Sequence, residues 1–259
     1  MGGPMGGPAS INRQSASSDQ GQGEELSYYA LEISSISDLI QQQNLFDYQS
    51  KVISSLRVMH CDQLSNLNGI QVQMFQNITD LNLSSNNIED LNELSNLRNV
   101  KILNMSCNKI VNICGLESMM GSLEKLVLSH NRIASLGYFK KLVVNGQVAP
   151  NLTTIDLNDN YIGELAQVEH LKQIASLQDL TFQNKNSNNP MCDFENYQEA
   201  VLHHLPQISK LDGTSIYELG IDFKSQLDKA EMIKNQQRLQ LANNLTQPFY
   251  GHSGLQNYD

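Results

Sequence analysis

Four segments in the middle of the chain follow a single pattern, leucine-x-leucine-x-x-asparagine-x-isoleucine. Residues 81–88, 103–110, 126–133 and 155–162 read LNLSSNNI, LNMSCNKI, LVLSHNRI and IDLNDNYI. One copy of so short a unit cannot bury its own apolar side chains, so neighbouring copies have to stack on one another. The pattern therefore predicts a solenoid of stacked coils, which offers a broad surface to other proteins more readily than it encloses a catalytic pocket.

Two apolar periods alternate within each unit. Leu81 and Leu83 are two residues apart, as one face of a short strand requires. The next apolar positions recur every three residues, which favours a tight helical or 3₁₀ turn. The predicted fold class is thus an α/β solenoid, a right-handed superhelix with short parallel strands on its concave face and 3₁₀ or helical turns on its convex side. The positions of period three are Ile88, Leu91, Leu94 and Leu97; Ile110, Ile113, Leu116 and Met119; Ile133, Leu136, Phe139 and Leu142; and Ile162, Leu165, Val168 and Leu171.

The asparagine of each unit has a structural task. Asn86, Asn108, Asn131 and Asn160 stand where each strand turns toward the convex side. Such a turn leaves backbone donors and acceptors buried between coils, and an amide side chain carries both a donor and an acceptor. We therefore expect these four residues to form a stacked ladder that satisfies each turn and its neighbour.

The ends of the repeat array are less regular. Residues 56–61 read as an earlier unit with cysteine in the asparagine place, and residues 31–36 as a further partial coil. Leu180-Thr181-Phe182 is a last strand that loses the asparagine, and a different element should cover it, because an open coil would expose an apolar face. Val143–Pro150 is an insertion that should loop out from one rim.

These patterns divide the chain into four parts. Residues 1–25, rich in Gly, Pro, Ser and Gln, are predicted to be a disordered tail. Residues 26–216 form the solenoid, with a cap at about 183–216. Residues 217–244 favour a C-terminal helix, which either shields the cap or docks on a partner, and residues 245–259 form a flexible tail.

Composition argues against several kinds of function. The net charge is −10 with a pI near 5.0, and no cluster of Lys and Arg offers a phosphate-binding surface, so direct nucleic-acid binding is not expected. No apolar run is long enough to span a membrane. The four cysteines, Cys61, Cys107, Cys114 and Cys192, show no metal-ligand spacing and are expected to be reduced, with Cys107 and Cys192 packed as small apolar side chains. We expect no cofactor, no metal and no catalytic residue, since phosphate-loop and nucleophile-elbow motifs are absent.

The repeats and the cap resemble the leucine-rich repeat proteins of the 22-residue type that end in an LRR-cap, a group that includes the outer-arm dynein leucine-rich-repeat light chain. The resemblance covers roughly residues 50–216. Within this group the chain is more similar to the N-terminal domain of the leucine-rich-repeat and coiled-coil centriolar protein family, through the pairs and runs at 60–61, 83–86, 105–108 and 188–192 and the long third unit. The long coiled coil of that family is missing here. The cap is carried by Asn189-Pro190-Met191-Cys192, Tyr197, Val201-Leu202, Leu205-Pro206 and Leu211-Asp212-Gly213.

The resemblance implies centrioles, basal bodies and cilia. We accordingly expect a non-catalytic adaptor or scaffold in the cytoplasm and cytoskeleton, placed in a ciliary axoneme, basal body or centriole, with protein partners from those assemblies. A regulatory subunit of a phosphatase or dynein motor, using the same surface, is the alternative.

The candidate binding surface is the concave face, where strand residues alternate with the buried leucines. It is polar and mildly acidic with an apolar spot at Ile102 and Val127, and would suit a helical or extended partner segment carrying Lys or Arg. An ordinary solvated sheet face, with partners elsewhere, is the alternative. The predicted residues are Asp80, Asn82 and Ser84; Ile102, Asn104 and Ser106; Lys125, Val127 and Ser129; Thr154, Asp156 and Asn158; and Asp179, Thr181 and Gln183.

Overall fold

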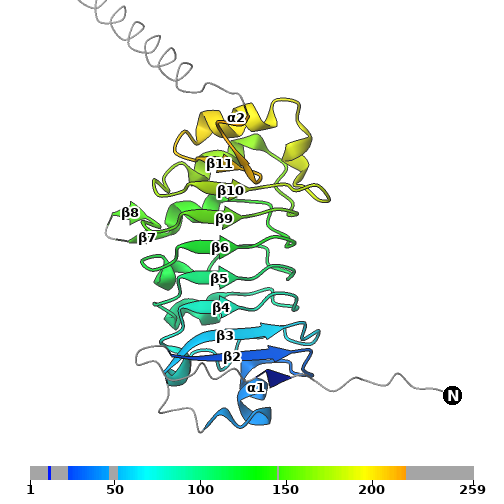
Figure 1. Cartoon of the computed structure of the whole chain (residues 1–259), viewed down its shortest axis with the longest axis vertical. Coiled ribbons are helices and arrows are strands. Elements are labelled where there is room, and N and C mark those ends of the chain that lie inside the picture. Colours follow the sequence, from blue (N-terminus) through cyan, green and yellow to red (C-terminus); the bar gives the residue numbers. More distant parts are fainter. Residues whose placement is uncertain (1–10, 13–22, 47–51, 145, 220–259) are drawn as a thin grey trace, which may run out of the picture. The chain divides into compact units, whose positions relative to one another are not determined.

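The computed structural model describes residues 11–12, 23–46, 52–144 and 146–219, and its main feature is one ten-stranded sheet in which each coil adds a strand (Figure 1). Every pairing from β2 to β11 is parallel, and β1 and β12 add antiparallel strands at the two edges. The parallel stack confirms the predicted solenoid. The strands, in sheet order, are β1 Ile11–Asn12, β2 Glu24–Tyr29, β3 Ile53–Met59, β4 Asp80–Asn82, β5 Ile102–Asn104, β6 Lys125–Val127, β9 Thr154–Asp156, β10 Asp179–Thr181, β11 Lys210–Leu211 and β12 Thr214–Ser215.

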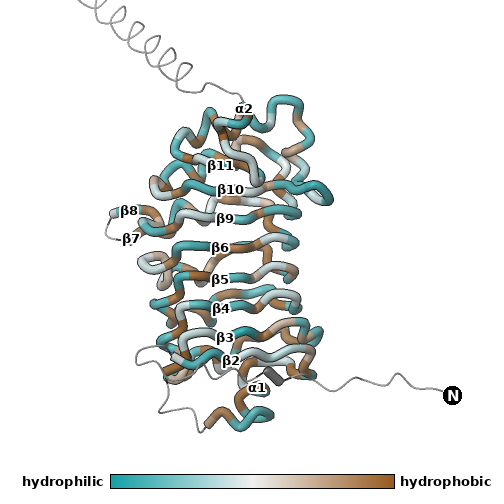
Figure 2. Tube along the Cα trace, viewed as in Figure 1, coloured by the Kyte–Doolittle hydropathy of each residue, from teal (hydrophilic) through white to brown (hydrophobic). Residues whose placement is uncertain are grey.

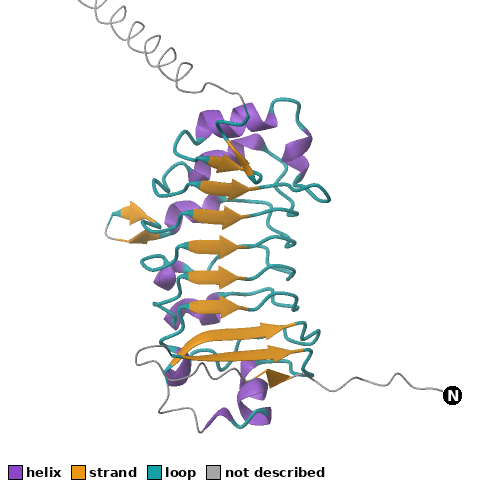
Figure 3. Ribbon diagram, viewed as in Figure 1, coloured by secondary structure: helices purple, strands orange, loops and turns teal. Residues whose placement is uncertain are grey.

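Short 3₁₀ turns return the chain from one strand to the next, and Figure 3 shows them apart from the column of strands. They are η2 Gln73–Phe75, η3 Asn92–Asn96, η4 Glu117–Met119, η5 Gly137–Lys141 and η6 Leu165–Leu171. All but one of the predicted positions of period three are buried. Leu165 is the exception: it is half-buried, because it is the first residue of η6, the longest of these turns.

The core lies inside the stack of coils, between the sheet and the 3₁₀ turns. Leu81, Leu103, Leu126 and Ile155 meet in register on adjacent strands and are all 0% exposed. Apolar and polar stretches therefore alternate within each coil, as the tube in Figure 2 shows. Each coil buries its leucines against the next, which is the source of stability in a repeat fold.

The N-terminal end differs from the prediction for residues 31–36. The first strand of the partial coil is β2, Glu24–Tyr29, and residues 31–35 are the turn that follows it. The helix α1, Ile36–Gln42, then starts at a capping box formed by Ser35 and Asp38. The predicted tail boundary also shifts, because β1 and the start of β2 lie within residues 1–25: β1 pairs with the open backbone groups of the β2 edge.

The insertion in the third unit forms a hairpin of its own. β7, Val143–Val144, pairs antiparallel with β8, Gln147–Val148, in a two-stranded sheet separate from the main one. Figure 1 shows it projecting beyond the column of strands, as the 29-residue step from Leu126 to Ile155 predicted.

The C-terminal end is covered by the predicted cap. The turn η7, Pro190–Asp193, leads into α2, Tyr197–His204, which packs against η6. Asp212 completes the cover: its Oδ1 accepts the backbone N–H of Phe182 at 2.8 Å, and its Oδ2 accepts the Tyr197 hydroxyl at 2.9 Å. Residues 217–219 form a turn, and the rest of the predicted C-terminal helix and tail lies outside the described residues. No helix in the described ranges is both long and apolar enough to cross a membrane.

Candidate binding surface

Strand register places the outward side chains in two straight rows, which together we call the sheet face. Each row crosses the strands and takes one residue from every coil. Adjacent strands are about 4.8 Å apart, so a partner lying along a row meets a new side chain at that interval. The first row is Glu25, Ser55, Asp80, Ile102, Lys125, Thr154, Asp179 and Lys210, and the second, which ends at β10, is Ser27, Arg57, Asn82, Asn104, Val127, Asp156 and Thr181. Ser55 shares the register of the first row but is buried, at 4% exposed.

The apolar spot predicted from the sequence lies at the middle of the sheet face. Ile102 is 40% exposed, which is high for a large apolar side chain, and Val127 is half-buried one strand further on. Lys125 is exposed beside them and pairs in register with Ile102. Two strands therefore supply an apolar contact and a cation next to each other.

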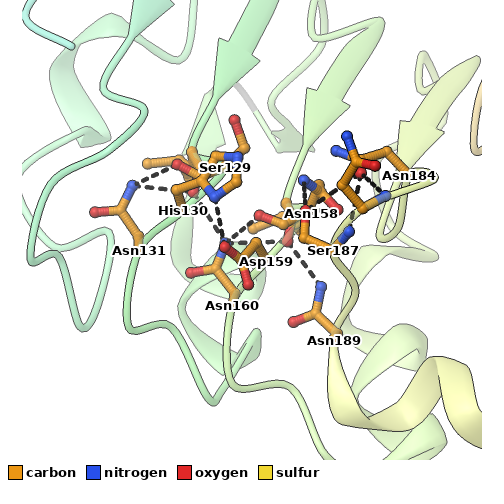
Figure 4. A network of polar contacts seen from close by, with 12 residues as sticks. Ser129, His130, Asn131, Asn158, Asp159, Asn160, Asn184, Ser187 and Asn189 are labelled. Atoms are coloured by element: carbon orange, nitrogen blue, oxygen red, sulfur yellow. Dashed lines mark hydrogen bonds and ion pairs between the residues drawn. The ribbon is translucent and has the colours of Figure 1, made fainter. Parts of the chain in front are cut away.

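Two of the predicted surface residues are buried instead. Ser129 is 8% exposed and Asn158 is 2% exposed. The Asn158 amide donates to the Ser187 hydroxyl at 2.9 Å, because the loop after β10 folds over this end of the strand (Figure 4). The Ser129 side chain is hydrogen-bonded to the Asp156 carboxylate. Both belong to the support of the surface, and the other predicted residues are at least partly exposed.

Acidic groups on the sheet face are partly neutralised within it. Asp80 lies 3.5 Å from the Arg57 guanidinium, and Asp179 lies 3.2 Å from the Lys210 ammonium. Asp156 has no such partner at contact distance in the described part of the chain. Burial raises the pKa of Asp156, an effect opposed by hydrogen bonds from the Asn158 backbone and the Ser129 side chain. A partner's Lys or Arg beside Asp156 would relieve this cost.

Sequence reasoning missed four positions of the sheet face that are at least partly exposed. They are Glu25, Ser27, Arg57 and Lys210, and their strands lie in coils whose repeat pattern is degenerate or capped. The signal that could have found three of them is alternation along the strand. Glu25 and Ser27 alternate with the buried Leu26 and Tyr28 on β2, and Arg57 lies between the buried Leu56 and Val58 on β3.

The asparagine ladder forms as predicted, beneath the end of the sheet face. Asn131 is representative: its Oδ1 accepts the backbone N–H of Ile110 at 2.9 Å, and its amide donates to the carbonyls of Met105 and Leu128 at 3.0 Å each. Figure 4 shows Asn131 together with Asn160 and Asn189. Each side chain thus ties its own turn to the preceding coil. The same pattern holds at Asn86, Asn108 and Asn160.

A fifth rung corrects the prediction that the last strand loses its asparagine. Asn189 is 0% exposed, accepts the N–H of Ile162 at 3.1 Å and donates to the carbonyls of Leu157 and Phe182 at 2.8 Å each. The residue was overlooked because the loop at 183–188 places it seven residues after Phe182. In the regular units the distance is three residues.

The four regular turns of the ladder, and the turn at Cys61 before them, each hold one residue in the left-handed region. The residue before the asparagine position has φ of 54°, 58°, 55°, 56° and 53° at His60, Ser85, Cys107, His130 and Asp159. Residues other than glycine rarely adopt this backbone conformation, and in these turns it points the side chain of each residue outward. Cys107 is therefore exposed rather than packed as predicted, whereas Cys61, in the asparagine place, is buried.

All four cysteines are free thiols. The described residues contain no group of three His, Cys, Asp or Glu side chains placed to hold a metal ion. Burial raises the pKa of the Cys192 thiol to about 11, and burial also raises that of Cys61. Two pockets of about 430 and 200 Å³ lie elsewhere, under the β7–β8 hairpin and beside α1, and neither is lined by the sheet face.

Comparison with known proteins agrees with this geometry. The leucine-rich repeat family model matches residues 76–91. The fold is a leucine-rich repeat solenoid. Proteins with this fold generally mediate protein–protein interaction, and they are typically non-catalytic.

Solved structures similar to the chain include repeat proteins of distant sequence. Internalin C2 from Listeria monocytogenes is 17% identical, with 72% of this chain and 69% of that one covered and a TM-score of 0.49. Internalin F from the same organism is 18% identical, with 60% of this chain and 46% of that one covered and a TM-score of 0.38. A chain of the Drosophila melanogaster SNF/U2A′ complex is 26% identical, with 52% of this chain and 70% of that one covered and a TM-score of 0.39.

Proposed function

We propose that the protein is a non-catalytic adaptor whose sheet face docks a segment of a partner protein. The observation that carries this proposal is the apolar spot at Ile102 and Val127, which interrupts an otherwise polar, half-buried face in the middle of its two rows. Interfaces bind through a small apolar centre with a polar rim, and here the rim is supplied by the neighbouring strands.

Charge defines the partner segment further. The carboxylate of Asp156 is half-buried next to Val127, and Lys125 stands next to Ile102 on the other row. A partner that inserts an apolar side chain at the spot therefore fits best with a Lys or Arg beside Asp156 and an acidic group beside Lys125. Complementary charges of this kind fix the register of the bound segment and speed its association.

The test is a double substitution at the spot. Ile102→Asp plus Val127→Asp should abolish co-purification of the partner from the native source while the circular dichroism spectrum stays unchanged. The matched control is Val72→Asp plus Val143→Asp, which places the same charges on exposed valines away from the sheet face. If the first variant retains its partner as well as the control does, the sheet face is not the docking site.

The assembly in which the adaptor acts is the second part of the proposal. We place it in the cytoskeleton, in a ciliary axoneme, basal body or centriole, with components of those structures as partners. Support comes from the sequence resemblance to the centriolar repeat family through the cap and the long third unit. Quantitative mass spectrometry of isolated cilia against cell-body extract tests it: enrichment at fixed stoichiometry is expected, whereas a soluble pool bound to a phosphatase contradicts it.

A further inference from the structure

A second exposed patch lies past the turn, on the flank of the solenoid rather than on the sheet face. The residues after Asn108, Asn131 and Asn160 each donate a backbone N–H to the preceding coil. Lys109 donates to the carbonyl of Ile88 at 2.9 Å, Arg132 to that of Ile110 at 2.8 Å, and Tyr161 to that of Ile133 at 2.9 Å. These bonds hold Lys109, Arg132 and Tyr161 in one row, a coil apart.

The side chains of this row combine charge with apolar area. Tyr161 is 61% exposed, and Val111, two residues beyond Lys109, is 55% exposed. In the described residues no hydrogen bond or ion pair engages the side chain of Lys109 or Arg132. By contrast, Arg57 and Lys210 on the sheet face are each paired with an aspartate. We call Lys109, Val111, Arg132 and Tyr161 the flank patch.

Small residues border the patch on its outer side. Ala134 and Gly163 occupy the position that Val111 has in its own coil, and a side chain at Gly163 would meet nothing within 4 Å. An extended segment can therefore approach Arg132 and Tyr161 closely. The left-handed turn residues Cys107 and His130 separate the patch from the sheet face, so both surfaces can be occupied together.

We propose that the flank patch binds a short, extended, acidic segment of a second protein partner. This choice rests on charge complementarity. Two unpaired cations on neighbouring coils, with Val111 beside Lys109 and Tyr161 on the coil after Arg132, fit two carboxylates and an apolar residue. Alternate residues of an extended segment point the same way about 6.6 Å apart, within reach of two flexible cationic side chains on neighbouring coils.

A peptide suits this surface better than a nucleic acid. The patch holds two cations only. Glu89 lies on the coil before it, and Glu164 lies at its other end, on the coil of Tyr161. A continuous phosphate backbone would have to cross those carboxylates, in a chain whose net charge is −10. A short acidic motif places its negative charge between them.

Fluorescence anisotropy with the full chain tests the proposal directly. The probe is a fluorescein-labelled peptide in which glutamate alternates with leucine and serine, and its control is the same peptide with glutamine for glutamate. We expect the acidic probe to bind at low salt, and the glutamine probe to bind at least about tenfold more weakly.

Charge reversal locates the site. Lys109→Glu plus Arg132→Glu should weaken binding of the acidic probe at least about tenfold, and Tyr161→Ser should weaken it less. Lys140→Glu plus Lys172→Glu, which changes the net charge equally at exposed sites, should stay within about twofold of the wild type. Circular dichroism spectra of all variants should match that of the wild type.

Three results would overturn the proposal. They are failure of the wild type to bind the acidic probe, an equal loss of affinity in both double variants, and displacement of the probe by a single-stranded oligonucleotide at a lower concentration than unlabelled peptide requires. The last result would assign the patch to a phosphate polyanion instead. None of them bears on the sheet-face proposal, because the two surfaces share no residue.

Discussion

Removing one rung of the asparagine ladder should destabilise the solenoid far more than the loss of one polar side chain would indicate. Asn131 is 5% exposed and bonds to backbone groups of two coils, through the three bonds described above and a longer one to the Ser129 carbonyl at 3.2 Å. Asn131→Ala leaves the buried N–H of Ile110 without its acceptor. The carbonyls of Met105 and Leu128 each lose one bond and keep another, from the amides of Asn108 at 3.1 Å and Asn160 at 2.9 Å.

The size of the effect follows from those three groups. Leaving a buried donor or acceptor unsatisfied costs about 1 to 3 kcal/mol. That cost applies to the N–H of Ile110, whereas each carbonyl loses one of two hydrogen bonds, worth about 0.5 to 1.5 kcal/mol. We therefore expect the free energy of unfolding to fall by about 3 kcal/mol.

Urea unfolding followed by far-ultraviolet circular dichroism measures this, as the chain has no tryptophan. Asn77→Ala, an exposed asparagine, is the matched control and should change stability by less than about 0.5 kcal/mol. Asn131→Asp should cost at least as much as the alanine variant, because it keeps the acceptor but sets a negative charge against two carbonyls. A loss below about 1 kcal/mol for Asn131→Ala would refute the reasoning.

Three further outcomes test other parts of the structure. Cys107→Val should lower stability by about 1 to 2 kcal/mol in the same assay, because a β-branched residue is strained at φ 55°; an unchanged midpoint would contradict this. Asp156→Asn should raise stability at pH 7: burial raises the pKa of the wild-type carboxyl, so its ionised form opposes folding above that pKa, and the gain should shrink as pH falls toward 3.8. If Asp156→Asn and the wild type were equally stable both at pH 7 and near pH 3.8, the result would argue against this reasoning. Iodoacetamide at pH 8 should alkylate exposed Cys107 well before Cys61 and Cys192, read by mass spectrometry; equal rates would show that the coils open readily.

The sequence predicted the parts of this fold that depend on local pattern. Leu81 and its equivalents specify both the strand and the buried side, and the asparagine three residues after Leu83 specifies the turn. Asn189 could not be predicted in this way, because an inserted loop lengthens its distance in sequence from Phe182. Stacking of the coils still places its side chain in the ladder. The position of β2 was not predicted, because its unit carries no asparagine to mark the turn after the strand.

The candidate surface was predicted less completely, for a related reason. Alternation along a strand tells which residues leave the core, and this placed Ile102 and Lys125 correctly on the outside. Alternation does not show which loops fold over the outward residues. The burial of Asn158 by the loop that carries Ser187 could therefore be recognised only from the structure. The flank patch also needed it, since only the stacking of coils brings Lys109, Arg132 and Tyr161 into one row.

The most direct test of the docking account is lysine footprinting of the native complex. Acetylation with a limiting reagent, read by mass spectrometry, compares the isolated chain with the chain bound to its partners. Lys125 on the sheet face should be strongly protected in the complex, while Lys140 and Lys172, exposed on other surfaces, should react as they do in the free protein. Equal labelling of Lys125 in both states would contradict the claim that the sheet face holds a partner.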